Sequence, residues 1–270
     1  MNIKKIKDGK VELIASPKRV YTDLAARFVR SERELEEIIA TPYSKQLVKK
    51  IIESGHEACT EFDWFIFGIQ GFSRVTEAQL IRKRLASYMI KSGRIDLNGK
   101  RDFNVVFPDG LNYGTMIDAD SRGIFVDGVP LDEIITPEDK VQIRLNADGI
   151  LRIIEDWYND GIEMGYPEED LRYLKPQATE FKAIIGMNAH SLRDWFKIRC
   201  CKNAQKEIRD LAWKMLKLCK KETPDLFEDA GPNCIRLGYC PENSMQHESC
   251  KGKIITKNEA LELIKNNYKG

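Results

Sequence analysis

The 270-residue sequence has no long apolar run and no excess charge of one sign. No stretch approaches the roughly 18 consecutive apolar residues of a membrane-spanning helix, and residues 1–8 lack the apolar segment of a secretion signal. We therefore expect a cytoplasmic protein with no membrane partner. Because 43 basic and 42 acidic side chains leave a net charge of +1, the chain as a whole has no electrostatic preference for nucleic acid. Any anion site must be local.

The usual phosphate-binding and metal-binding motifs are also missing. Neither G-x-G-x-x-G nor G-x-x-x-x-G-K-[ST] occurs, so the common phosphate-binding loops are excluded. Seven cysteines, an odd number, favour reduced thiols over a disulfide framework. Cys234, Cys240 and Cys250 lie near His247, but their spacing lacks the C-x2-C pairs that make zinc predictions strong. The predicted site therefore contains no metal.

The sequence does contain enough apolar material for a sizeable core. Hydrophobic residues make up 42% and charged residues 31%, which is typical of a globular chain and excludes disorder. Periodicity and capping residues predict helices over 31–39, 42–55, 73–89, 136–161 and 191–221, with a short one from Thr256. Strands are expected over 63–69, 103–107, 123–131 and 179–187.

Long helices beside a few strands, without a strict alternation of the two, predict an α+β fold. We expect one catalytic domain over residues 1–230, with a β-rich insertion at about 100–135. Residues 231–270 should form a cysteine-bearing C-terminal extension with a short helix.

Cations border the apolar face of the helix predicted over 73–89. Steps of about 100° per residue place Gln79, Arg82 and Lys83 on one stripe beside that face. Charge at the edge of an apolar face suits a phosphate held in a cleft by guanidinium groups. Ion pairs with the many acidic residues would produce the same pattern, so the helix alone leaves both explanations open.

A wider pattern adds to this stripe. The run Gln79-Leu80-Ile81-Arg82-Lys83-Arg84-Leu85-Ala86-Ser87, followed by Ser92-Gly93-Arg94, resembles the signature of the flavin-dependent thymidylate synthases, Arg-His-Arg-x-x-Ser followed by Ser-x-Arg. Further matches in the family's order are Ser54-Gly55-His56-Glu57 with Glu61, Asn188-Ala189-His190-Ser191-Leu192 and Ile198-Arg199. Several separated matches in order are more specific than any single one.

The resemblance implies a fold and a reaction. The fold would be a central, mostly antiparallel sheet flanked by long helices. The reaction would be the reductive methylation of dUMP to dTMP, with methylenetetrahydrofolate supplying the carbon, reduced FAD the hydride, and NADPH the electrons for the flavin. The resemblance also implies a homotetramer whose subunits share active sites, and no protein nucleophile.

Residue roles carry over from the resemblance position by position. On the nucleotide side they fall on Gln79, Arg82, Ser92, Gly93, Arg94, Arg172 and Arg199. On the cofactor side they fall on His56, Glu61, Arg82, Lys83, Arg84, Asn188, His190 and Asp194. Arg199 would be catalytic, stabilising the pyrimidine ring as its N3 ionises, and His56 would be the second catalytic residue, within reach of proton transfer. On the predicted helix, Arg84 lies about 140° from Gln79 and could reach a neighbouring subunit's flavin.

Three cofactor-side positions depart from the family motif. Lys83 replaces a His, His190 an Arg, and Asp194 an Asn, so the motif predicts weaker FAD binding because a carboxylate near a pyrophosphate is repulsive. Two alternatives stay open, a pyrimidine-nucleotide C5 hydroxymethylase and an inactive paralogue that binds nucleotide or partner subunits. The sequence also does not distinguish dUMP from dCMP.

Overall fold

The computed structural model describes residues 4–91, 104–106, 114–119, 125–126, 129–130, 141–242, 248–250 and 253–267. The chain forms two compact units. Residues 1–7 and 92–180 make up the first, which we call the insertion unit, and residues 8–91 and 181–270 the second, which we call the sheet unit. The α+β fold class is confirmed. The boundaries predicted for a catalytic domain and an extension, 1–230 and 231–270, stay predictions.

A four-stranded sheet organises the sheet unit. Its order is β2 (Lys10–Ala15), β3 (Trp64–Ser73), β10 (Glu180–Asn188) and β4 (Ser87–Ile90). The pairs β2 with β3 and β10 with β4 are antiparallel. Along β3, Phe65, Phe67 and Ile69 are buried while Trp64 and Ile66 are exposed, as a strand with one covered face requires.

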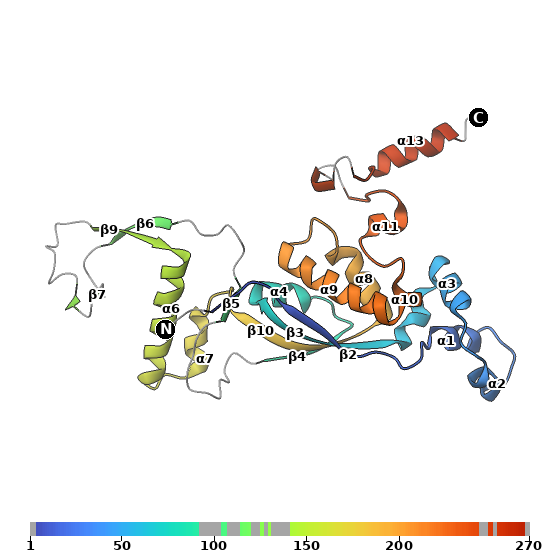
Figure 1. Cartoon of the computed structure of the whole chain (residues 1–270), viewed down its shortest axis with the longest axis horizontal. Helices are drawn as coiled ribbons and strands as arrows, with labels where there is room; N and C mark the ends of the chain where they lie inside the picture. The colour runs from blue at the N-terminus through green and yellow to red at the C-terminus, as the bar shows by residue number, and fades with distance from the viewer. Residues whose placement is uncertain are drawn as a thin grey trace. The chain divides into compact units, whose positions relative to one another are not determined.

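Helices α8 (Ala189–Arg199) and α9 (Lys206–Glu222) lie on one side of this sheet (Figure 1). Their apolar residues, including Leu192, Phe196 and Leu211, join those of the strands in one buried cluster. The remaining helical segments of the unit are α1 (Thr22–Phe28), α2 (Leu35–Ala40), α3 (Lys45–Glu53), η1 (Glu57–Phe62), α4 (Arg74–Leu80), α10 (Pro224–Phe227), α11 (Asn233–Leu237), η3 (Glu248–Cys250) and α13 (Lys257–Asn267). None of the described helices is long and apolar enough to cross a membrane.

A buried carboxylate joins α1 to the start of β3. Asp63 accepts hydrogen bonds from the backbone N–H of Tyr21 (2.7 Å) and of Thr22 (3.1 Å), and from the Thr22 hydroxyl (2.6 Å). Burial raises the pKa of Asp63, and these three donors only partly offset that effect. The carboxylate thus satisfies donors at the first turn of α1 that the helix itself leaves unpaired.

The described part of the insertion unit contains short strand pairs followed by helices. β1 (Lys4–Ile6) runs parallel to β5 (Asn104–Val106), while β6 (Gly114–Ala119) pairs antiparallel with β9 (Val141–Asn146), and β7 (Phe125–Val126) with β8 (Val129–Pro130). α6 (Ala147–Glu163), α7 (Glu168–Leu171) and the short helix η2 (Arg172–Leu174) follow. Val105, Leu151, Tyr158 and Leu171 form its small core. A Cβ at Gly161 would lie only 2.5 Å from Leu171 Cδ2, so this approach of α7 to α6 depends on glycine.

Four predicted segments fall where strands are found. The core strands expected at 63–69 and 179–187 are β3 and β10, the strand at 103–107 contains β5, and the hairpin expected over 123–131 contains β7 and β8. The capping box of the terminal helix is also confirmed, because Thr256 Oγ1 accepts from the N–H of Glu259 while the Glu259 carboxylate accepts from the N–H of Thr256.

Several helix predictions were wrong at their ends. The helix expected over 136–161 begins at Ala147, capped by Asn146, and residues 141–146 form β9 instead. Its expected start at 136–139 lies outside the described residues. The helix expected over 31–39 begins at Leu35, and the Ser31 hydroxyl accepts from the backbone N–H of Arg33 instead of capping it. The next helix begins at Lys45 rather than near Pro42. The helix expected over 191–221 is two helices, α8 and α9, separated by a turn in which the N–H of Ala204 donates to the Cys201 carbonyl oxygen.

Candidate active site

The three successive cations of the motif lie in a turn between α4 and β4. α4 ends at Leu80, so the helix predicted to reach Met89 is wrong, and with it the single helical stripe of Gln79, Arg82 and Lys83. Residues 87–90 pair with β10 instead. The Tyr88 hydroxyl donates to the carbonyl oxygens of Leu80 (2.9 Å) and Lys83 (2.8 Å), which holds the turn against the strand.

This turn gives the three cations different surroundings. Arg82 and Arg84 are exposed, while Lys83 is half-buried. Because Arg84 lies in this turn and not on a helix, the angle of about 140° expected between Gln79 and Arg84 does not apply.

Gln79, Arg82 and Arg199 come together between α4 and the end of α8. Arg199 donates from Nη1 to Gln79 Oε1 and from Nη2 to the Gln79 carbonyl oxygen, each over 3.3 Å. Burial lowers the pKa of Arg199, and the nearby charge of Arg82 lowers it further. No carboxylate among the described residues forms an ion pair with either guanidinium. Two neighbouring, uncompensated cations favour an anionic ligand.

Asp194, one turn after His190 on α8, is surrounded by cations. Its carboxylate accepts from Lys197 Nζ (2.9 Å) and lies 3.7 Å from Lys83 Nζ and 3.8 Å from His190 Nε2. Burial acts to raise the pKa of Asp194, but the hydrogen bond and charge of Lys197, with smaller contributions from Lys83 and His190, lower it overall. The premise that Asp194 adds an unneutralised carboxylate was therefore wrong.

The start of α8 carries polar groups that suit an anionic cofactor. Asn188 Oδ1 accepts from the N–H of Ser191 (2.8 Å), so Asn188 caps the helix. Nδ1 of His190 is buried and has no hydrogen-bond partner among the described residues. Together with the cations at 82–84, the N-terminal end of α8 fits the phosphates of a dinucleotide such as FAD. The cofactor roles of Asn188, His190 and Asp194 stay predictions.

His56 precedes the short helix η1 and Glu61 lies within it, and both are exposed. The backbone N–H of His56 donates to the Ile51 carbonyl oxygen (3.1 Å), but its side chain makes no capping hydrogen bond. An imidazole that is neither buried nor capping is open to a ligand, which is compatible with its predicted role.

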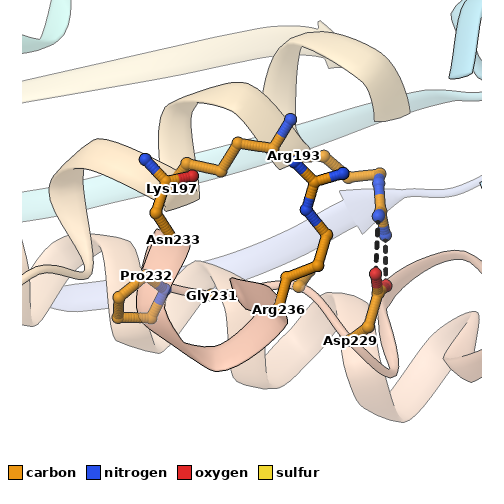
Figure 2. A pocket seen from close by; sticks show the side chains of 8 residues that line it. Arg193, Lys197, Asp229, Gly231, Pro232, Asn233 and Arg236 are labelled. Carbon is orange, nitrogen blue, oxygen red and sulfur yellow. Dashed lines mark hydrogen bonds and ion pairs between the residues drawn. The ribbon is translucent and has the colours of Figure 1, made fainter. Parts of the chain in front are cut away.

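Sequence reasoning missed a buried network of ion pairs around Arg193. Arg193 donates to both oxygens of Asp229 (2.7 and 3.0 Å) and to the Leu226 carbonyl oxygen, and lies 3.4 Å from the Glu57 carboxylate. Figure 2 shows the Arg193–Asp229 pair among the residues that line a small pocket, together with Lys197 and Arg236. The only local signal was a charged residue beside Leu192 on the apolar face of α8.

The remaining predicted nucleotide contacts lie in the insertion unit or outside the described residues. Arg172 lies in the insertion unit, exposed at the start of η2. Ser92, Gly93 and Arg94 lie outside the described residues. Their roles stay predictions.

The fold is similar to that of a solved nucleotide-methylating enzyme. The UMP/dUMP methylase PolB from Streptomyces cacaoi, crystallised with 5-Br dUMP, aligns with a TM-score of 0.62 and 20% sequence identity, over 84% of this chain and 96% of that one. At this identity the likeness shows the fold.

Sequence comparison identifies the family. The flavin-dependent thymidylate synthase of Geobacter sulfurreducens is 35% identical over 212 residues, covering 78% of this chain and 80% of the relative. The enzyme of Clostridium tetani bearing the same name is 33% identical over 244 residues, covering 87% and 90%. The family described as thymidylate synthase complementing protein matches residues 12–225. The chain belongs to this family of flavin-dependent thymidylate synthases, which confirms the predicted resemblance.

Proposed function

We propose that this chain methylates dUMP reductively to dTMP, with methylenetetrahydrofolate as carbon donor, FAD as flavin and NADPH as reductant. Membership of the flavin-dependent thymidylate synthases supports the reaction over a C5 hydroxymethylase or an inactive paralogue. The observation that carries the proposal is the contact of Arg199 with Gln79 beside Arg82, because it presents two uncompensated cations where an anionic nucleotide would bind.

In this reaction Arg199 acts by charge. Its two hydrogen bonds to Gln79 fix the plane of the guanidinium, so its remaining N–H groups can point at a pyrimidine oxygen and stabilise the negative charge that develops as N3 ionises. Arg82 supplies the second cation, suited to the nucleotide phosphate. Bound FAD would supply the hydride, and no cysteine is needed as a nucleophile.

On the cofactor side, the chain's own residues bind and orient. Lys83 and His190 both face the Asp194 carboxylate, which holds their side chains in place for an anionic ligand. Arg84 remains exposed in the turn and can contact a further phosphate. His56 and Glu61 complete the proposed set.

An exposed apolar sheet face supports a homotetramer. Ile184 and Met89 lie directly opposite each other on β10 and β4 and are 50% and 75% exposed. Trp64 and Ile66 are exposed on the neighbouring strand β3, and Ile14 covers Gly68 on the same face. Large apolar side chains gathered on one sheet face favour burial against other subunits. A cytoplasmic location, without nucleic acid or membrane partners, belongs to the same proposal.

Product analysis tests the reaction. The purified chain is incubated with dUMP, methylenetetrahydrofolate, NADPH and FAD, and the product is identified by mass. dTMP is expected only when all four are present. Arg199→Ala should lower kcat about 100-fold, as the loss of one charge-stabilising group does, whereas Arg33→Ala, an exposed arginine away from the cluster, should not. A hydroxymethylated product, or full activity in Arg199→Ala, would overturn the proposal.

Light scattering tests the oligomer. The wild-type chain should have the mass of a tetramer, and Ile184→Glu should dissociate it because a charge would enter the covered face. Lys217→Glu, at an exposed position of α9 on the helix-covered side of the sheet, is the control for adding a carboxylate. A wild-type monomer with full activity would contradict the shared active site.

A further inference from the structure

The conformation of the turn between α4 and β4 decides which group each of its cations faces. Arg82 lies close enough to Arg199 for its charge to lower the pKa of that guanidinium, whereas Lys83 Nζ lies 3.7 Å from the Asp194 carboxylate. Two consecutive residues thus face different groups, one on the proposed nucleotide side and one on the proposed cofactor side. Because they share a peptide unit, a rotation of the backbone within the turn would move both side chains.

The start of α4 is fixed to α9 by a carboxylate. Glu207 accepts from the backbone N–H of Ser73 (2.5 Å) with Oε1 and from the Ser73 hydroxyl (2.6 Å) with Oε2. Ser73 is also the N-cap of α4, where its side chain accepts from the N–H of Thr76. The helix is therefore held at its first residues, and the position of the cations depends on what holds the turn after its last residue.

A tyrosine of β4 holds that turn. Leu80 is the last residue of α4, so its carbonyl oxygen has no partner within the helix. This oxygen accepts from the N–H of Lys83 (3.2 Å) and from the Tyr88 hydroxyl (2.9 Å). The same hydroxyl, which has a single proton to share, also lies 2.8 Å from the Lys83 carbonyl oxygen. One phenol thus holds the peptide groups at both ends of residues 80–83.

The Tyr88 ring is itself anchored in the sheet. Tyr88 lies opposite the fully buried Ile185 of β10, and its ring packs against the buried cluster of the sheet unit. Burial raises the pKa of Tyr88 to about 12, so the hydroxyl keeps its proton at neutral pH and remains a donor. The turn is therefore tied to the packed core by a side chain with little freedom to move.

We propose that Tyr88 is a positioning residue of the active site, whose hydroxyl sets the turn so that Arg82 faces the nucleotide and Lys83 faces the flavin cofactor. The inference rests on the proposed function, because these two ligands belong to that reaction. Tyr88 acts through the backbone carbonyl groups of Leu80 and Lys83. Residue 88 lies between the two parts of the sequence motif, 82–87 and 92–94, so the motif assigns it no role.

The clamp predicts a coupled effect on two ligands. Without the hydroxyl the turn samples other conformations, and the fraction of molecules with both cations in place falls. The apparent affinity for each ligand is reduced by that fraction, so dUMP and FAD should be weakened by a similar factor. Once both are bound, the competent conformation is selected, and kcat at saturation should change little.

Tyr88→Phe tests the clamp, because it removes one oxygen and keeps the ring. Calorimetry with dUMP and fluorescence titration with FAD should each show a Kd raised about three- to tenfold, the loss expected for one hydrogen bond in this coupled arrangement. In steady-state assays the KM for dUMP should rise in parallel, while kcat at saturation stays within about twofold of the wild-type value.

Tyr43→Phe is the matched control. Tyr43 is also half-buried in the sheet unit, and its hydroxyl donates to Asp225 Oδ2 (2.9 Å), away from the turn. Its loss should lower Tm about as much as Tyr88→Phe does but leave both affinities and the KM unchanged. Equal losses of affinity in the two variants would reflect a general loss of stability and would overturn the positioning role.

Hydrogen exchange gives a measurement that needs no ligand. Backbone amides of residues 81–86 should exchange faster in Tyr88→Phe than in the wild-type chain or in Tyr43→Phe, and equal rates would overturn the proposal. A wild-type chain that binds dUMP and FAD no more tightly than Tyr88→Phe does would overturn the positioning role alone. A wild-type chain that binds neither ligand would overturn the proposed function, and this inference with it.

Discussion

Replacing Arg193 by Met should destabilise the sheet unit strongly. The Arg193 side chain is 2% exposed and Glu57 is 6% exposed, whereas Asp229 is 39% exposed. Breaking a buried ion pair by removing one partner typically costs about 3 to 5 kcal/mol, because the other charge stays buried. Among the described residues Glu57 would keep one cationic partner, Lys197 at 3.7 Å, and the Leu226 carbonyl oxygen would lose a donor. Asp229 can be solvated by water, so we expect a loss of about 3 to 4 kcal/mol.

A double-mutant cycle isolates the buried charge. Glu57→Gln keeps the shape of the side chain but removes its charge, so Arg193→Met with Glu57→Gln should be less destabilised than the sum of the single variants, by about 1 to 3 kcal/mol. Urea unfolding gives the free energies, and Tm should fall by roughly 2 to 4 °C per kcal/mol in Arg193→Met. Protein concentration is held fixed because subunit association changes Tm.

The control comes from the same pocket. Arg236 lines it but is exposed (Figure 2), so Arg236→Met should change the free energy of unfolding by less than about 0.5 kcal/mol. A loss below about 1 kcal/mol in Arg193→Met, or strictly additive single variants, would refute the claim that the arginine compensates a buried carboxylate.

Three further predictions concern the carboxylates of Asp63, Asp229 and Asp194. Asp63→Ala should cost about 2 to 4 kcal/mol in urea unfolding, because it leaves buried donors at the start of α1 unpaired, and Asp63→Asn should cost less because it keeps an acceptor. The Asp229 pKa is lowered because Arg193 outweighs burial, so stability should fall as pH drops below about 4, and less steeply in Arg193→Met; identical acid profiles would exclude this pairing. Fluorescence titration should show that Asp194→Asn tightens FAD binding and Lys83→His weakens it, each about two- to fivefold; unchanged affinities would place both residues away from the cofactor.

Local patterns predicted the strands of the sheet better than the ends of the helices. The strand at 63–69 was recognisable because its aromatic and β-branched residues form a continuous buried run. Residues 87–90 continue the periodicity of α4, yet they pair with β10, and local periodicity contains no information about a partner strand about 95 residues later in the chain. Val141 to Asn146 did carry a signal that was missed, the alternation of apolar and polar residues typical of a strand.

In the candidate site too, some residues could be predicted from the sequence and others could not. The order of the motifs assigned Gln79, Arg82 and Arg199 to the nucleotide side, and the structure brings these three residues together. Their partners could not be predicted, because the ion pairs of Arg193 join residues 57, 193 and 229, and no spacing rule connects positions so far apart. An arginine on an otherwise apolar helix face was the one available indication that a buried acidic partner existed.

The departures at positions 83 and 194 are best understood as one change. The family motif has a His and an Asn at these two positions, and together they carry no charge when the imidazole is neutral. Here Lys83 and Asp194 lie 3.7 Å apart, and their charges also sum to zero. The substitutions therefore exchange a neutral pair for an ion pair with little change in the potential around it. What a cofactor phosphate would meet is then decided by the groups that the pair orients, His190 and Lys197.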